Sequence, residues 1–259
     1  MKNNMTSSFK PTDTLTGKVA VITGGTGAIG LASAHRLAKL GARCVLLYNS
    51  ESPEAAAAKA ASLDGVGHLT FKASVTDSVS LKAVADQVAA QCGVVHILIN
   101  SAGYTQAVPA NDLEALTDEL IDDILKVNFR GVIATIRAFM PLLKKSEDGL
   151  IINISSIAGF TGTGSNLAYV AAKASIDVVG DALAKAFAPY VRVISVSPGV
   201  VDSTFVPGRG ADFNEKVATT IPLRRIGTVD DVAAVVQACA TTMRYVTGTR
   251  IVVDGGRHL

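Results

Sequence analysis

Tyr169 and Lys173 lie four residues apart in an alanine-rich stretch that predicts a long helix. Residues at positions i and i+4 share a helix face, so the Lys173 ammonium can lie beside the Tyr169 phenol and favour its ionised form. A free phenol has a pKa of about 10, and lowering it by about three units takes roughly 4 kcal/mol of differential stabilisation. Ser156 lies upstream at the end of an apolar strand, and Asn128 lies earlier still. Together these residues predict a proton-transfer site.

The Tyr-x-x-x-Lys spacing also occurs in ordinary helices, so the elements around it decide its meaning. The apolar run 18–23 predicts a strand, which leads through the sequence TGGTGAIG at 23–30 into a predicted helix at 28–40. Glycines in such a turn let the backbone approach a pyrophosphate, and the helix N-terminus offers it amides and a positive dipole end. The alternative is a tight turn without a ligand. The predicted dinucleotide contacts in this turn are Gly24, Thr26, Gly27, Ile29 and Gly30.

The end of the second predicted strand, 44–48, should select the cofactor. An acid there bonds the ribose 2′-hydroxyl of NAD and repels the 2′-phosphate of NADP. This chain has the neutral residues Asn49 and Ser50 instead, which favours NADP. NAD stays open as the alternative, because Glu51 is close and no arginine or lysine is evident in the glycine turn or directly after the strand.

Small residues and a proline follow two further predicted strands, 96–100 and 191–196. Small side chains let the backbone pass close to a cofactor, and a proline stiffens a turn so that the next amides point into the crevice. The alternative is a pair of ordinary strand-ending turns. The predicted cofactor contacts in these turns are Asn100, Ala102 and Gly103 after the first strand and Pro198, Gly199 and Val201 after the second.

Strands alternate with helices along the chain, and each strand is almost continuously apolar, as strands covered on both faces must be. Because parallel neighbours need crossover connections, the pattern predicts an α/β fold, a single-domain Rossmann-type doubly wound parallel sheet with helices on both faces. The domain should span 15–259, after a flexible tail at 1–14. The predicted strands are 18–23, 44–48, 68–73, 96–100, 150–155, 191–196 and 250–253, and the predicted helices are 28–40, 53–63, 78–91, 112–125, 132–143, 168–187 and 230–240.

Segment 203–226 breaks this rhythm, because glycines, prolines and charges mix there without a sustained period. Such segments often form ligand lids, so we predict a substrate lid here, with a second substrate loop at 104–113. Val206 and Phe213 favour a partly hydrophobic substrate, although they can also pack a lid shut. The arginines of this segment can meet an acidic carrier or, as the simpler interpretation, lie in solvent; they are Arg209, Arg224 and Arg225.

The composition excludes several classes of protein. The chain has 259 residues and a formal net charge of +2, and it contains no basic run interleaved with aromatic residues, so no nucleic-acid partner is expected. No apolar stretch approaches the roughly 18 residues of a membrane span, and the N-terminal segment lacks the apolar region of a secretory signal. We therefore expect a soluble cytoplasmic protein without membrane contact. The three cysteines and four histidines are scattered, which predicts reduced thiols and no metal site.

From about Lys18 to Gly256 the chain resembles the short-chain dehydrogenase/reductase family. The likeness rests on the motifs TGGTGAIG, NSAG after the fourth strand, KVNFRG around Asn128, INISSIAG around Ser156, YVAAK at 169–173, and the later Pro-Gly pair. The segments IPLRRIGTVDDVA and YVTGTRIVVDGG make it more similar to the 3-oxoacyl-acyl-carrier-protein-reductase-like branch.

The resemblance implies a role for each candidate residue. Tyr169 would be the general acid/base, Ser156 would hold and polarise the carbonyl, and Lys173 would lower the tyrosine pKa and bond the nicotinamide ribose. Asn128 would support a water that relays protons. The family usually has an acid after the third strand to contact the adenine, whereas this chain has Ser74 followed by Val75, which are the predicted cofactor contacts at this place.

The predicted function is hydride transfer between NADP(H) and a ketone or secondary alcohol, with a small-molecule substrate of the 3-oxoacyl type or another carbonyl compound. The alternatives are an NAD-dependent alcohol dehydrogenase of the same family and a dinucleotide-sensing protein without catalysis. The helix of Tyr169 has a narrow polar stripe and is otherwise apolar, which predicts burial of a second face in a homo-oligomer, tetramer or dimer. A monomer in which another helix covers that face is the alternative. The stripe consists of Lys173, Asp177, Asp181 and Lys185.

Overall fold

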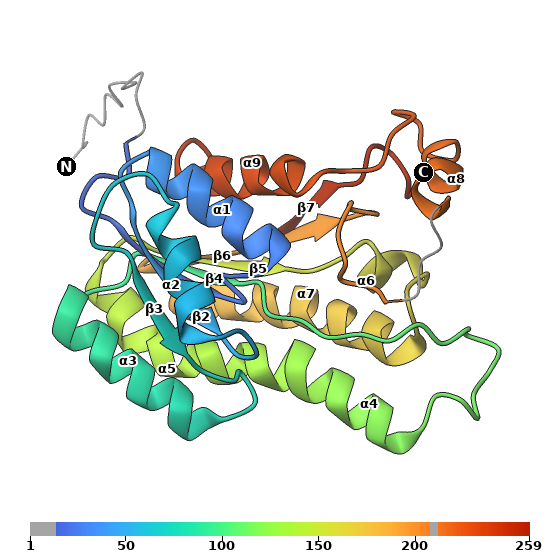
Figure 1. Ribbon diagram of the computed structural model, residues 1–259, viewed down its shortest axis with the longest axis horizontal. Helices are drawn as coiled ribbons and strands as arrows, with labels where there is room; N and C mark the ends of the chain where they lie inside the picture. Colours follow the sequence, from blue (N-terminus) through green and yellow to red (C-terminus); the bar gives the residue numbers. More distant parts are fainter. Residues whose placement is uncertain (1–13, 208–211) are drawn as a thin grey trace, which may run out of the picture.

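The computed structural model describes residues 14–207 and 212–259. All of the predicted tail except Thr14 lies outside these residues, as do residues 208–211 of the predicted lid. Seven parallel strands form one sheet in the order β3-β2-β1-β4-β5-β6-β7, which confirms the doubly wound Rossmann-type fold (Figure 1). The strands are β1 (Val19–Thr23), β2 (Arg43–Tyr48), β3 (Leu69–Lys72), β4 (Ile97–Asn100), β5 (Gly149–Ile154), β6 (Val191–Pro198) and β7 (Thr249–Val253).

Helices cover both faces of the sheet (Figure 1). They are α1 (Ala28–Lys39), α2 (Pro53–Ala61), α3 (Ser78–Cys92), α4 (Asp118–Leu125), α5 (Gly131–Lys145), α6 (Ala158–Thr161), α7 (Leu167–Phe187), α8 (Phe213–Ala218) and α9 (Val229–Ala240), with a π-helical turn η1 (Lys126–Arg130).

Successive residues of β1 point into two different cores. Ala20 and Ile22 pack with α1 and α9, whereas Val19 and Val21 pack with α3, α5 and α7. Apolar side chains are therefore needed on both faces, which explains the unbroken apolar runs of the strands.

The strand order reverses direction between β1 and β4. In open α/β sheets the crevice outside the carboxyl ends of the strands, at such a reversal, is where ligands bind. The register of the parallel pairs aligns Thr23 with Asn100 and Asn100 with Asn153, so the loops that follow β1, β4 and β5 leave the same edge of the sheet. The predicted glycine turn, the NSAG segment and Ser156 all lie in these loops.

One helix begins later than predicted. The expected helix at 112–125 starts only at Asp118, because the Asp112 carboxylate accepts a hydrogen bond from the Ala115 amide at 3.1 Å and forms a turn instead. Thr117 then caps α4 by accepting from the Leu120 amide at 3.3 Å. Local side-chain capping, rather than the apolar period, sets where this helix begins.

The polar stripe of α7 divides between two environments. Lys173 and Asp177 are buried beneath the helix, whereas Asp181 and Lys185 are exposed. The outer face also shows an apolar residue, Val178, with 70% of its surface exposed. The stripe is therefore not one solvent-facing row, and its first two residues belong to the protein interior.

Candidate active site

Helix α7 and the end of β5 bring Tyr169 and Lys173 together. The Asn166 side chain caps α7 by accepting a hydrogen bond from the Tyr169 amide at 2.7 Å, which fixes Tyr169 in the first helical turn. Lys173 follows one turn later, and its Nζ lies 5.5 Å from the centre of the Tyr169 ring. The same Nζ donates to the carbonyl of Ile154, the last residue of β5, at 2.7 Å. The ammonium is thus anchored to the strand while it lies near the phenol.

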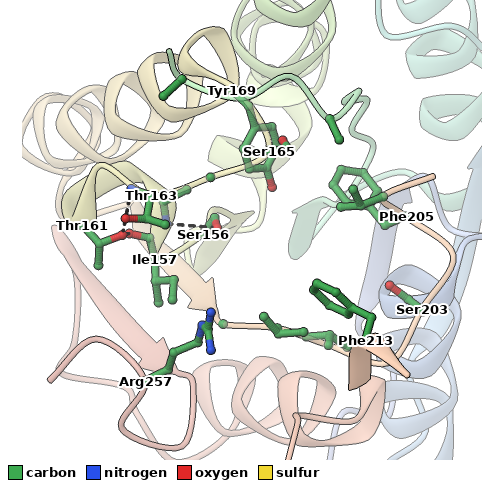
Figure 2. Close-up of a pocket in the computed structure, with 18 of the residues that line it drawn as sticks. Ser156, Ile157, Thr161, Thr163, Ser165, Tyr169, Ser203, Phe205, Phe213 and Arg257 are labelled. Carbon is green, nitrogen blue, oxygen red and sulfur yellow. Dashed lines mark hydrogen bonds between the residues drawn. The ribbon is translucent and has the colours of Figure 1, made fainter. Parts of the chain in front are cut away.

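The turn from β5 into α6 positions Ser156. Its Oγ accepts a hydrogen bond from the Ala158 amide at 3.2 Å. Gly159 allows α6 to approach α7, because a Cβ there would come 2.8 Å from the amide nitrogen of Ala174. Ser156 and Tyr169 line the same cavity, and Figure 2 shows them on neighbouring parts of its wall. The structure therefore brings the predicted hydroxyl, phenol and ammonium into one region.

Burial controls the charge of Lys173. Removal from water lowers the pKa of its ammonium from 10.5 to about 8, and the negative charge of Asp177 opposes this fall. Burial raises the pKa of the Asp177 carboxyl in turn, while the neighbouring hydroxyls of Ser155 and Ser195 and the charge of Arg250 oppose that rise. Arg250 Nη1 lies 3.5 Å from Asp177 Oδ2. A buried acid thus helps to keep the lysine near Tyr169 protonated.

Asn128 lies in the π-helical turn η1 and is fully buried. Its Nδ2 donates to the carbonyls of Tyr104 at 2.7 Å and Ile124 at 2.9 Å, and its Oδ1 accepts from the Tyr104 amide at 3.3 Å. The side chain thereby fixes the loop after β4 to the helix. The water-relay role that the resemblance implied for Asn128 stays a prediction, and the geometry adds this clamping role.

The glycine turn after β1 fits a closely approaching phosphate. Gly24 has a φ of +60°, and a Cβ on it would come 2.9 Å from the Cα of Ala102 in the loop after β4. A Cβ on Gly30 would come 2.3 Å from the carbonyl oxygen of Gly24, so α1 can start this close to the turn only with glycine. Gly27 is the N-cap of α1, and no side chain caps this end among the described residues. The amide end of α1 is therefore available to an anion, as a dinucleotide pyrophosphate requires.

The region expected to hold the adenosine ribose contains a lysine that sequence reasoning missed. Asn49 and Ser50 are exposed at the end of β2, as their predicted role requires. Lys59 of α2 donates to the Thr26 carbonyl at 2.8 Å and forms an ion pair with Glu51, the residue after Ser50. A cation therefore lies beside the glycine turn, although none is near it in the sequence. No sequence signal pointed to Lys59, because Glu51 precedes α2 and the contact with Thr26 joins segments that are far apart in the chain.

The remaining predicted cofactor residues lie on the loops around this crevice. Ser74 and Val75 are partly exposed after β3, and Val75 packs against the position of Gly131, where a Cβ would come 2.8 Å from its Cγ2. Asn100 donates to Asn153 Oδ1 at 2.9 Å, and its own Oδ1 is buried without a hydrogen-bond partner among the described residues. Such an orphaned acceptor fits a site that a ligand completes.

The loops after β4 and β6 complete the crevice. Ala102 and Gly103 follow β4, and the Ala102 amide donates to Thr23 Oγ1 at 3.3 Å. Pro198 ends β6, and its carbonyl accepts from the Ile157 amide at 3.0 Å, which joins this turn to the Ser156 loop. Two further predicted residues follow: Gly199, whose amide donates to the Val253 carbonyl at 3.0 Å, and Val201, which forms a β-bridge with Gly227.

A cavity of about 1000 Å³ opens beside Ser156 and Tyr169 (Figure 2). The predicted lid supplies much of its wall, including Val206 and Phe213, and the Phe205 ring lies 6.1 Å from the Tyr169 ring. The predicted loop at 104–113 contributes residues 107–110. Among the lining residues that sequence reasoning missed are Arg257 and His258, which lie on the turn beyond the carboxyl end of β7.

Two of the lid arginines, Arg224 and Arg225, do not line this cavity. Arg225 forms an ion pair with Asp231, and Arg224 donates to the Thr219 carbonyl at 2.6 Å, while Arg209 lies outside the described residues. Within residues 14–207 and 212–259 no group of His, Cys, Asp and Glu is arranged to hold a metal ion. The same residues contain no helix with the length and apolar character that crossing a bilayer requires. The cysteines are free thiols.

The chain is similar to known proteins over almost its whole length. A family model described as Enoyl-(Acyl carrier protein) reductase matches residues 24–258. A Streptomyces violaceoruber protein named as a ketoacyl reductase of the granaticin polyketide synthase is 35% identical over 250 residues, 96% of this chain and 99% of the relative. The 3-oxoacyl-acyl-carrier-protein reductase FabG of Escherichia coli is 31% identical over 245 residues, 94% of this chain and 98% of FabG. A solved glucose/ribitol dehydrogenase-type structure from Brucella melitensis is 28% identical with a TM-score of 0.87, covering 94% of this chain and 98% of that chain.

Proposed function

Because this chain belongs to the short-chain dehydrogenase/reductase family, we propose that it moves a hydride between NADP(H) and the carbonyl carbon of a ketone, interconverting ketone and secondary alcohol. The family makes the chain an oxidoreductase that uses a nicotinamide dinucleotide and resembles ketoacyl reductases. The observation that carries the proposal is the convergence of Ser156 and Tyr169 on one cavity, with the Lys173 ammonium 5.5 Å from the Tyr169 ring.

The proposed chemistry assigns one task to each side chain. The cofactor supplies the hydride when it is bound. Hydride addition builds negative charge on the carbonyl oxygen, so the Ser156 hydroxyl donates a hydrogen bond to this oxygen and the Tyr169 phenol donates a proton to it. The Lys173 ammonium stabilises the phenolate that remains. In the oxidation direction the phenolate accepts the proton from the alcohol.

We assign the dinucleotide to the crevice at the carboxyl ends of β1, β2 and β4. The pyrophosphate would lie on the glycine turn and the first amides of α1, and the adenosine ribose would lie near Asn49 and Ser50. The absence of an acid at these two positions and the cation of Lys59 beside Thr26 support NADP. Glu51 opposes this preference, so NAD is the competing cofactor.

For the substrate we propose a 3-oxoacyl-type ketone or another carbonyl compound with an apolar part. The similarity to ketoacyl reductases supports this class, as do the apolar side chains of Phe205, Val206 and Phe213 in the cavity wall. The decisive experiment is a panel of ketones and secondary alcohols, assayed with NADPH and NADH in parallel by nicotinamide absorbance. Turnover of at least one pair supports the proposal.

A second candidate function, dinucleotide sensing without catalysis, makes the opposite prediction. It would show saturable NADPH binding with no absorbance change on any member of the panel. The complete set of Ser156, Tyr169 and Lys173 favours the catalytic function.

The outer face of α7 supports a homo-oligomer, a dimer or a tetramer. Val178 is 70% exposed there and lies among small residues, a surface suited to close packing against a second copy. Val178→Asp should lower the mass measured by sedimentation velocity, and Val79→Asp on the exposed face of α3 is the control. A monomeric wild type would contradict the assembly without affecting the proposed reaction.

A further inference from the structure

A cationic side chain lines the cavity on the side away from the reacting residues. Figure 2 shows the guanidinium of Arg257 directed into the cavity, opposite Tyr169. The wall beside it includes the apolar side chains of Ile157 and Phe213. A substrate that spans the cavity would therefore meet hydrogen-bonding groups at its carbonyl, an apolar wall along its length, and a positive charge at its far end.

No acidic group neutralises this arginine among the residues that the structure describes. The only hydrogen bond of its guanidinium there is from Nη1 to the neutral Thr220 Oγ1, at 2.9 Å. The described lining of the cavity contains neither Asp nor Glu. Other arginines have carboxylate partners, for example Arg36 with Asp230. Since a guanidinium carries five donors, Arg257 retains donors for a ligand.

Hydrogen bonds of the Asp254 side chain hold the turn that carries Arg257 in place. The Asp254 carboxylate accepts from the amides of Gly256 at 2.9 Å and His258 at 2.8 Å, and its Oδ2 lies 2.8 Å from the His258 ring nitrogen. Asp254, the acidic side chain closest to Arg257 in the sequence, is thus occupied by its own turn. Gly255 and Gly256 have φ values of +64° and +86° and pack against residues 221–223 of the lid segment. Both the lid and the turn therefore position Arg257 before a ligand arrives.

We propose that Arg257 binds an anionic group of the substrate, so that the preferred substrates are ketones with a carboxylate or phosphate at the far end of an apolar segment. A guanidinium binds either group through two parallel N–H donors, which neutral ketones cannot match. The inference rests on the proposed function, because it uses the same cavity and assumes a carbonyl near Ser156 and Tyr169.

The first test compares each oxo acid with its own methyl ester. Levulinate and its longer homologues are assayed with NADPH as free acids and as esters, and the phosphate monoester of 5-hydroxy-2-pentanone is compared with 5-hydroxy-2-pentanone as the phosphate arm. The wild type should reduce the anionic member of at least one series with a kcat/KM about tenfold or more above the neutral member. The series that shows this preference identifies the anion as carboxylate or phosphate.

Substitution then assigns the preference to Arg257. Arg257→Met should lower kcat/KM for the anionic substrate by about tenfold to a hundredfold, mostly through KM, and leave the neutral member within about twofold. Arg257→Lys should retain part of the preference. Arg244→Met, at an arginine that is paired with Asp148 away from the cavity, is the matched control and should change neither. Activity on the neutral ester reports that the variants are folded.

The role of Arg257 would be overturned if the wild type had the same kcat/KM for the anionic and the neutral member of both series. It would also be overturned if Arg257→Met lowered kcat/KM equally for both members. Those results leave turnover itself intact, so they are distinct from failure of the proposed function. If no ketone is turned over, binding of octanoate and octanol tests the anion site instead. Octanoate should raise the thermal unfolding midpoint of the NADPH-bound wild type more than octanol does. Arg257→Met should remove this difference between the two ligands. Equal shifts with octanoate and octanol would refute the anion site.

Discussion

Replacing Lys173 by methionine should abolish catalysis and yet stabilise the folded protein near neutral pH. The side chain is buried with 6% of its surface exposed, and burial lowers its pKa from 10.5 to about 8. A lysine whose folded pKa is depressed costs stability wherever it is charged in both states, which here means below about pH 8. Methionine has a similar shape and no charge to desolvate.

The size of the effect follows from the two pKa values. Between pH 8 and 10.5 the unfolded chain holds the proton that the folded protein has lost, so wild-type stability rises with pH through this window. At one pKa unit per about 1.36 kcal/mol, the wild type should gain about 2.5 kcal/mol from this group between pH 7 and pH 10. Loss of the hydrogen bond to the Ile154 carbonyl costs about 1 kcal/mol at both pH values and cancels in the comparison.

Urea unfolding of the wild type and Lys173→Met, without cofactor, at pH 7 and pH 10 measures this difference. The stability of the variant relative to the wild type should be greater at pH 7 than at pH 10 by about 2.5 kcal/mol. Lys185→Met makes the same substitution at an exposed lysine of the same helix and is the control for the change of side chain. If the Lys173→Met difference is the same at both pH values, the lysine is not desolvated and the electrostatic account of the site is refuted.

Three further results are expected. Asp177→Asn removes the charge that raises the Lys173 pKa, so the alkaline limb of the kcat/KM profile should move to lower pH; an unchanged limb would show that the acid does not act on the lysine. Lys59→Ala should lower kcat/KM for NADPH about tenfold more than for NADH. Lys82→Ala, at an exposed lysine, is the control. Equal losses with the two cofactors would show that Lys59 does not select between them. Gly30→Ala drives a Cβ against the Gly24 carbonyl, so it should weaken NADPH binding in calorimetry or lower the unfolding midpoint; wild-type values for both would contradict the close turn.

The fold was largely predictable because each local signal agreed with the global pattern. Strands buried on both faces have continuous apolar sequences, and the glycine turn predicts the connection from β1 to α1. The start of α4 was missed because Asp112 and Thr117 set it through side-chain hydrogen bonds, which an apolar period does not encode. The π-helical turn around Asn128 falls between the predicted helices at 112–125 and 132–143, and no pattern in the sequence predicted it.

The candidate site was predictable where motifs cluster and unpredictable where distant segments meet. Tyr169, Lys173 and Ser156 could be named because their motifs occur together with the glycine turn and the strand-end turns, whereas Lys59 and Arg257 lie on elements that the sequence does not connect with them. Asp177 belonged to an apparent polar stripe, and only the packing of α7 on the sheet shows that it is buried under Lys173. Long-range packing decides these positions, and a single sequence carries little information about it.

The most direct test of the account is the kcat of Tyr169→Phe on a ketone that the wild type reduces. Loss of the phenolic hydroxyl should lower kcat by about a hundredfold to ten-thousandfold, the usual contribution of a general acid, with the NADPH dissociation constant within about twofold of the wild type. Tyr245→Phe makes the same chemical change on a fully exposed ring and should have no effect. Wild-type turnover by Tyr169→Phe would contradict the assignment of Tyr169 as the proton donor.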